Sequence, residues 1–203
     1  MNYFKITFSA AILSLIVTSC GGESEAESQS DNSEDESVEK LDFDTENATE
    51  IMGDLSMCIN IHNQIFPEDL PYTDATNFDD YDPYFPLTGD EILAFSLTNL
   101  GIDSSASVNL SYWTEMSSDY MTYVFNVMPN EHELATYIVS YELDYTYVDH
   151  LQIAYDDIAE GFQTESSELT KEGINKTIKT YFDEEKIEKV SFKLNDSGHF
   201  EKH

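Results

Sequence analysis

The chain contains no arginine, and its nine lysines are set against 41 aspartates and glutamates, which gives a formal net charge of −32 at pH 7. The shortage is local as well, because residues 51–170 carry 22 acidic side chains and no lysine at all. Nucleic acid is excluded as a partner, since binding to phosphates requires clustered cations. No salt bridge can form within this stretch, so we expect its carboxylates to face water, metal ions or a basic partner.

Motifs of known catalytic chemistry are also scarce. The sequence has no Gly-x-Ser-x-Gly and no glycine-rich phosphate loop. His132 and Glu133 begin a His-Glu-x-x-His pattern, but Thr136 occupies the second histidine position, so the two-histidine zinc geometry is missing. Cys58 and His62 would share a helix face, where packing is favoured over a metal site or a thiol–imidazole pair. These absences favour a non-enzymatic protein and leave an activity open.

The N-terminus has the features of an export signal. Lys5 supplies a positive charge, and residues 6–17 form a mostly apolar run that is shorter than the roughly 20 residues needed to span a bilayer. Val17, Thr18, Ser19 and Cys20 follow. This tetrad resembles the lipobox of bacterial lipoproteins, and the resemblance implies a diacylglycerol on Cys20 and removal of residues 1–19. The alternative is an ordinary secretory signal cut near Ser19.

A tether is expected between the lipid and the folded part. Residues 21–40 contain five serines and eight acidic side chains, too polar a composition to bury a core. We therefore assign residues 20–45 to the lipidated cysteine and an acidic disordered tether. An acidic, serine-rich run after the lipidated cysteine also resembles export signals of surface lipoproteins. We expect an outer-membrane lipid anchor, with the periplasmic and the outward face both open.

Residues 46–203 are the size of one domain, and their pattern predicts an α+β fold. Two N-terminal helices, over 47–66 and 88–101, would pack on an antiparallel sheet of about six strands. Asn47 with Glu50 and Thr88 with Glu91 form capping pairs for these helices. The expected strands are 108–113, 120–128, 136–148, 151–155, 177–182 and 187–194.

The sequence also gives a structural prediction for each of three further segments of this domain. Residues 134–141 also fit a helix that begins at Asn130, although a strand is favoured. Residues 163–173 are polar and are expected to form a surface connection. Residues 68–87 are rich in proline, aspartate and aromatic residues and are expected to form a long functional loop.

Candidate site residues come from that loop and from the tyrosines. Asp79, Asp80 and Asp82 resemble the start of a calcium loop, although Pro83 and Tyr84 break the EF-hand spacing. Ca²⁺ is the one cofactor that the sequence suggests. Tyrosines on an exposed sheet face could stack on sugar rings, although tyrosine is common in strands. The candidate ligand-binding tyrosines are Tyr81, Tyr84, Tyr145 and Tyr147.

The sequence thus predicts a lipid-anchored envelope protein that binds a basic protein or cations through a strongly acidic surface. No catalytic residue is assigned. The alternative is a lipoprotein that binds glycans or assists polysaccharide processing through its tyrosines.

The lipid anchor gives the first testable prediction. Cells that express the protein and grow on radiolabelled palmitate should label it, because acyl chains would be attached at Cys20. Cys20→Ala should abolish the label, whereas Cys58→Ala should retain it. Label that persists in Cys20→Ala would contradict the assignment.

Overall fold

The structure, a computed structural model, describes residues 55–102, 105–158, 162–182 and 184–203. The signal peptide, Cys20, the tether and the Asn47–Glu50 capping pair lie outside these residues, so the expectations placed on them stay predictions. Within the described ranges, no helix combines the length and the apolar character needed to cross a bilayer.

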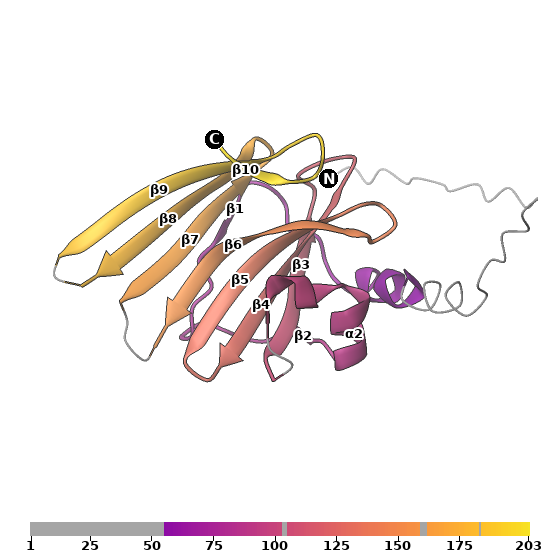
Figure 1. Ribbon diagram of the computed structural model, residues 1–203, viewed down its shortest axis with the longest axis horizontal. Coiled ribbons are helices and arrows are strands. Elements are labelled where there is room, and N and C mark those ends of the chain that lie inside the picture. The colour runs from indigo at the N-terminus through magenta and orange to yellow at the C-terminus, as the bar shows by residue number, and fades with distance from the viewer. Residues whose placement is uncertain (1–54, 103–104, 159–161, 183) are drawn as a thin grey trace, which may run out of the picture. The chain divides into compact units, whose positions relative to one another are not determined.

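The described residues form one antiparallel sheet of ten strands (Figure 1). The strand order is β10-β9-β8-β7-β6-β5-β4-β3-β2, so each of these strands pairs with its neighbours in sequence, while β1 pairs with β7. The bounds are β1 Tyr72–Asp74, β2 Phe85–Pro86, β3 Ser107–Thr114, β4 Met121–Asn130, β5 Glu133–Tyr141, β6 Tyr147–Asp157, β7 Gln163–Thr170, β8 Gly173–Tyr181, β9 Glu185–Leu194 and β10 Phe200–Lys202.

The predicted α+β class is therefore wrong. Strands make up 52% of the described residues and helices 13%. One helix of seven residues or more is present, at 55–62, where two helices were predicted. The second predicted helix is a short α-helix, α2 (Gly89–Ala94), followed by a 3-10 turn, η1 (Leu97–Leu100). Residues 163–173 were expected to be a connection because they are polar, but most of them form β7, whose polar side chains find partners inside the fold.

Several local predictions are confirmed. Thr88 and Glu91 form the capping box of α2, with a side-chain bond in each direction. Gly101, where the second helix was expected to end, ends η1 in the left-handed conformation, at φ 72°. The ambiguous segment 134–141 is a strand, and the expected strands 177–182 and 187–194 correspond to β8 and β9, which pair with each other.

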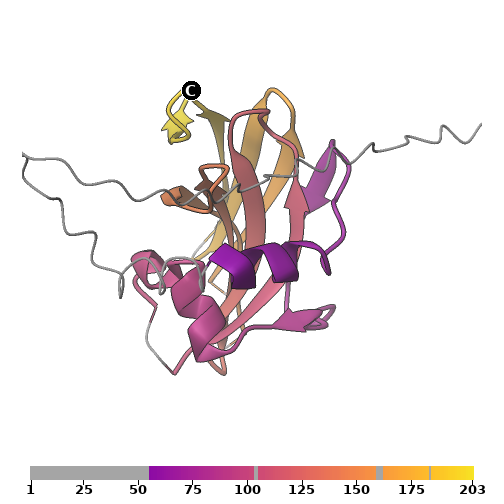
Figure 2. The ribbon, with the colours of Figure 1, turned by 90° about the vertical axis from the view of Figure 1, so that its right-hand side faces the viewer.

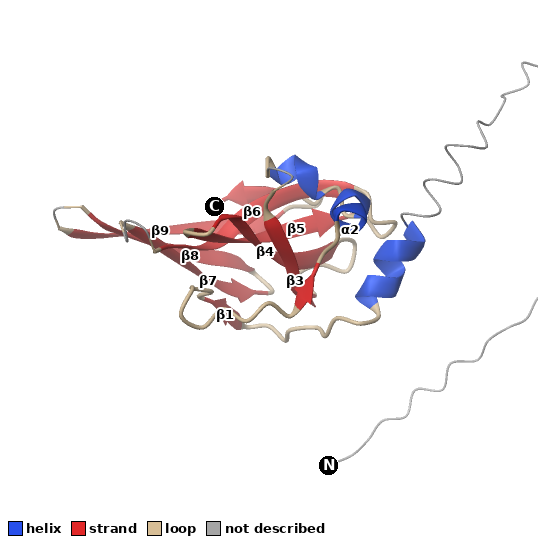
Figure 3. Cartoon of the chain, turned by 90° about the horizontal axis from the view of Figure 1, so that it is seen from below, coloured by secondary structure: helices blue, strands red, loops and turns tan. Residues whose placement is uncertain are grey.

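One core lies between the helices and the sheet. Figure 3 shows the helices gathered over the end formed by β3, β4 and β5, away from β8 and β9, and Figure 2 shows the same layer from the side. Phe95, fully buried at the end of α2, lies at the centre of this core. Its ring makes edge-on contacts with Tyr123, Phe125 and Tyr141, at centroid distances of 5.6–6.0 Å.

A second core joins the two halves of the sheet where β6 and β7 part. These strands pair only at Tyr155–Glu165 and Asp156–Thr164, and β7 then pairs with β1. The second core contains Tyr112, Val124, Ile138, Ile153, Leu169 and Ile174.

The backbone of β6 needs new partners at this parting, because buried carbonyl groups must accept hydrogen bonds. Side chains supply them. The Lys176 ammonium donates to the carbonyl oxygen of Gln152 at 3.0 Å, and the Ser167 hydroxyl donates to that of Ile153 at 2.6 Å. The sheet can therefore divide here without leaving these two carbonyls unsatisfied.

Lys176 also forms a buried ion pair with Glu165, at 2.5 Å, with side chains 10% and 5% exposed. The Gln152 and Gln163 amides donate to the same carboxylate at 2.7 and 2.8 Å. The expectation that carboxylates of residues 51–170 face water, metal or a partner thus fails at Glu165. Its cation comes from outside that stretch.

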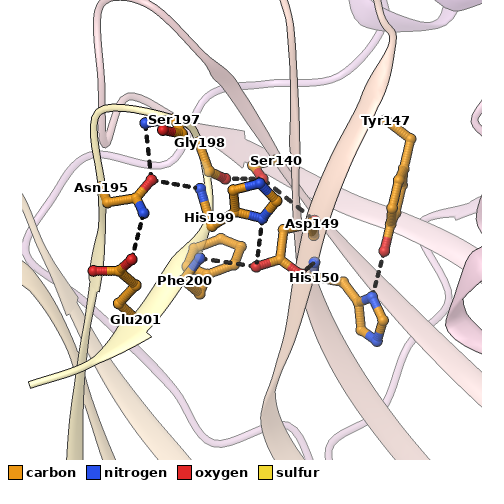
Figure 4. A network of polar contacts seen from close by, with 10 residues as sticks. All are labelled: Ser140, Tyr147, Asp149, His150, Asn195, Ser197, Gly198, His199, Phe200 and Glu201. Carbon is orange, nitrogen blue, oxygen red and sulfur yellow. Dashed lines mark hydrogen bonds and ion pairs between the residues drawn. The ribbon is translucent and has the colours of Figure 1, made fainter.

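The C-terminal turn fastens β10 to the middle of the sheet (Figure 4). The Ser140 hydroxyl donates to the Gly198 carbonyl at 2.6 Å, and the Phe200 amide donates to the Asp149 carboxylate at 2.9 Å. His199 also lies 3.5 Å from Asp149, with its ring turned toward the carboxylate in Figure 4. These contacts bring β10 against β6, and the turn before β10 against β5.

The buried ion pair gives a prediction on stability. Lys176→Ala should lower the free energy of unfolding by about 3–5 kcal/mol, because it leaves the Glu165 charge buried and unpaired. The double variant Glu165→Leu with Lys176→Met should lose much less, since no charge is then buried. Urea unfolding measures both. A single variant as stable as the wild type would contradict the importance of this pair.

Candidate functional site

The residues before β2 fold over β3 and β4 and enclose a hollow of about 560 Å³. We call it the acidic hollow. Four carboxylates and five aromatic rings line it, and none of its lining residues is a lysine or a histidine. The carboxylates are those of Glu68, Asp74, Asp80 and Asp82, and the rings are those of Phe66, Tyr72, Tyr81, Tyr84 and Tyr112.

Asp74 is the most deeply placed of these acids, at 2% exposure. The Tyr112 hydroxyl donates to its Oδ2 at 2.8 Å, and the Thr76 hydroxyl and amide donate to its Oδ1 at 2.7 and 3.1 Å. No cationic group among the described residues lies within 4.0 Å of it. Neutral hydrogen-bond donors alone therefore hold this buried carboxylate.

Three phenols of the acidic hollow, those of Tyr72, Tyr81 and Tyr112, have a raised pKa and stay protonated near neutral pH. Burial, and then the nearby Asp74 charge, raise the pKa of Tyr112 well above its ordinary value. Burial also raises the pKa of Tyr72 and of Tyr81. These three hydroxyls are thus neutral, and their rings offer uncharged faces.

Neighbouring strands fix the orientation of two of these rings. The Asn109 side-chain amide of β3 donates to the Tyr81 hydroxyl at 2.6 Å. Asn109 is 2% exposed, and its Oδ1 has no hydrogen-bond partner in the described part of the chain. The rings of Tyr72 and Tyr112 meet edge to face, with centroids 5.0 Å apart. Asn109 and Tyr112 of β3 therefore hold the Tyr81 and Tyr72 rings, whereas Phe66 and Tyr84 are 75% and 56% exposed.

The three predicted calcium ligands do not all line the acidic hollow. Asp80 and Asp82 line the acidic hollow, whereas Asp79 does not. The Asn77 side chain accepts the backbone amides of Asp79 and Asp80 at 3.0 and 3.2 Å, which shapes this turn. Over the described ranges, no group of three or more histidine, cysteine, aspartate or glutamate side chains is placed to hold a metal. Calcium binding stays a prediction.

The four predicted ligand-binding tyrosines lie at two different hollows. Tyr81 and Tyr84 line the acidic hollow, but Tyr145 and Tyr147 line a different hollow of about 510 Å³ beside the helices. The Tyr145 hydroxyl lies 3.4 Å from that of Tyr123, and the Tyr147 hydroxyl bonds to the His150 ring. The four tyrosines therefore do not share one site.

Cys58 and His62 lie on the helix over residues 55–62 but have different partners. The Cys58 thiol is fully buried and donates to the Ala94 carbonyl at 3.5 Å. The His62 Nδ1 lies 2.7 Å from the Tyr123 hydroxyl, at a third hollow of about 460 Å³, and burial lowers the pKa of its ring. Packing accounts for Cys58, as the sequence favoured.

Sequence reasoning did not name Asp74, Glu68, Tyr72 or Tyr112 as site residues, although the first three lie in the segment 68–87 that was expected to form a functional loop. Asp74 followed by Thr76 is a local signal for a side-chain turn. That signal could not show that Asp74 is buried, because its burial depends on the pairing of β1 with the distant β7.

Comparisons with protein-family models, with curated proteins and with solved structures found no match to this chain. The function of the acidic hollow is therefore argued from its own chemistry.

The bond between Tyr112 and Asp74 gives a stability prediction. Tyr112→Phe should lower the free energy of unfolding by about 1–3 kcal/mol, because it leaves a buried carboxylate short of a donor. Tyr84→Phe, at a tyrosine that is 56% exposed on the same hollow, is the matched control and should change little. Thermal unfolding measures both, and equal losses in the two variants would count against the role of Tyr112.

Proposed function

We propose that the protein is a lipid-anchored binding protein of the bacterial envelope, without a catalytic role, whose acidic hollow takes the cationic side chain of a basic protein. One observation carries this proposal: Asp74, Asp80, Asp82 and Glu68 share a tyrosine-lined hollow that contains no cation of its own. The lipid anchor rests on the lipobox resemblance at Cys20.

The chemistry of the acidic hollow suits a lysine or arginine side chain. A cation over an aromatic face gains about 0.5–2 kcal/mol, and more where water is excluded. Tyr81 and Tyr84 offer such faces next to the carboxylates of Asp80 and Asp82. A neutral ligand would leave four carboxylates uncompensated, so the charges favour a cationic one.

A glycan is the second candidate. Tyrosine rings that adjoin aspartates and the Asn126 amide, as in the acidic hollow, also suit sugar stacking and hydroxyl recognition. Tyr145 and Tyr147 cannot bind the same sugar as Tyr81 and Tyr84, because the two pairs of tyrosines line different hollows.

Titration followed by NMR tests the proposal. The probe is Nα-acetyl-lysine methylamide, and its neutral control is Nα-acetyl-norleucine methylamide, which keeps the apolar stem. We expect the lysine probe to shift the ring signals of Tyr81 and Tyr84, and the neutral probe to leave them in place.

Matched variants separate the hollow from the general acidity of the protein. Asp80→Asn with Asp82→Asn should weaken binding of the lysine probe by tenfold or more, since two carboxylates are lost. Glu131→Gln with Glu142→Gln removes the same charge at exposed residues outside the hollow and should have little effect. Equal losses in both pairs would refute a specific site, and a shift with neutral disaccharides alone would favour the glycan.

A further inference from the structure

One edge of the sheet is open along the outer part of β9. β10 pairs with residues 192–194 of β9, and the His203 amide donates to the Ser191 carbonyl at 2.8 Å. Among the described residues, none pairs with residues 185–190 on that side, where β9 runs along the margin of the sheet (Figure 1). An open strand edge is a template for pairing with a further strand.

Alternate residues of β9 direct their backbone groups to this open edge. The N–H and C=O of one strand residue point to the same side, and in an antiparallel sheet that side alternates along the strand. The Ser191 carbonyl and the Asn195 amide bond to the chain in and next to β10, so the odd-numbered residues of β9 face outward. The backbone groups that point to the open edge are therefore those of Glu185, Ile187 and Lys189.

The side chains of this segment have a charge order that reverses about its middle residue. Residues 185–189 read Glu-Lys-Ile-Glu-Lys, so they carry no net charge, and all of them are exposed. When a second copy of the strand lies antiparallel about Ile187, each lysine faces a glutamate. The pairs are Lys186 with Glu188, Glu185 with Lys189, and Ile187 with its own copy. Opposite charges on directly facing residues stabilise an antiparallel pair of strands.

The neighbouring registers of such a pair are unfavourable. A shift by one residue sets backbone groups that face the open edge against groups that face β8. A shift by two residues sets like charges against each other, Lys186 against Lys186 in one direction and Glu188 against Glu188 in the other. Charged side chains commonly keep strand edges from pairing. Here their order repels in these registers and attracts in one, so it specifies a partner of the same sequence.

We propose that two copies of this chain pair antiparallel through residues 185–189 of β9, about a two-fold axis at Ile187, so that their sheets join. Each outward-facing residue exchanges both of its backbone hydrogen bonds with the residue opposite. Both copies use the same surface, so the contact closes as a dimer. None of these residues lines the acidic hollow, so the inference goes beyond the proposed function and does not depend on it.

The contact is small and joins two acidic molecules, so we expect a weak dimer. Salt at 0.15 M screens the repulsion between charges more than about 8 Å apart. Facing side chains of a strand pair have Cβ atoms about 4.5–5.5 Å apart, inside that distance. The dimer is therefore best sought at high protein concentration and physiological salt.

Sedimentation velocity over a range of concentrations tests the proposal, at 0.15 M NaCl, with Cys20→Ala in every sample so that lipid does not drive association. Lys186→Glu sets glutamate against glutamate across the axis, and Glu188→Lys sets lysine against lysine. Each single variant should weaken the dimer tenfold or more. The double variant Lys186→Glu with Glu188→Lys restores opposite charges and should dimerise like the parent.

A mixture of the two single variants tests the register. In the mixed pair, the glutamates of one chain at positions 186 and 188 face the lysines of the other, so 1:1 dimers should form although neither variant dimerises alone. The controls Lys171→Glu and Glu172→Lys make the same charge changes at exposed residues of the turn between β7 and β8, and they should dimerise like the parent.

Ile187→Pro tests the backbone bonds separately from the charges. The Ile187 amide faces the open edge and is not needed for the pairing with β8, so the monomer should tolerate a proline there. The dimer should be lost, because proline has no N–H to donate. Ile187→Val keeps the amide and is the matched control, and circular dichroism verifies that both variants are folded.

Several results would overturn the inference. A parent protein that stays monomeric at all concentrations would do so and would leave the edge to a strand of another protein. Single charge variants that dimerise like their controls, or a mixture of them that stays monomeric, would contradict the register. A folded Ile187→Pro variant that dimerises like the parent would show that the copies join at another surface.

Discussion

The burial of the Asp74 carboxylate is the constraint on which the acidic hollow depends. Neutral donors from Tyr112 and Thr76 hold it, and it is buried because β1 pairs with β7. That edge of β7 is open to β1 only because β6 leaves β7 after two residue pairs. The parting is in turn sustained by Lys176 and Ser167, which bond to the freed carbonyls of β6. The hollow and the divided sheet are thus parts of one arrangement.

The uneven charge of the sequence is reflected in the acidic hollow and in the interior of the sheet. Residues 51–170, which have no lysine, supply every carboxylate of the acidic hollow. Of the seven lysines that follow, Lys176 enters the interior as the partner of Glu165, while Lys186 and Lys189 stay exposed on β9. The shortage of cations in residues 51–170 therefore leaves the lining of the acidic hollow without a lysine.

Much of the local structure could be predicted from the sequence, and the architecture could not. The Thr88–Glu91 capping box and the β8–β9 hairpin depend on residues close in sequence, so their signals were readable. β7 was missed because Glu165 and Ser167 are polar, and their partners lie on β6 and β8. At the site, Asp80, Asp82, Tyr81 and Tyr84 were found from a loop rich in acids and rings. Tyr112 and Asp74 were not, since long-range pairing brings them together.

Whether the acidic hollow takes a cation can be tested with a crystal structure of the protein that contains a bromoalkyl ammonium ion. Bromine gives an anomalous signal, so the ligand can be located without bias from the protein map. We predict a strong peak inside the hollow, with the ammonium group near Asp80 and Asp82 and the alkyl stem along Tyr81 or Tyr84. Peaks spread over the acidic exterior, with none in the hollow, would contradict the account.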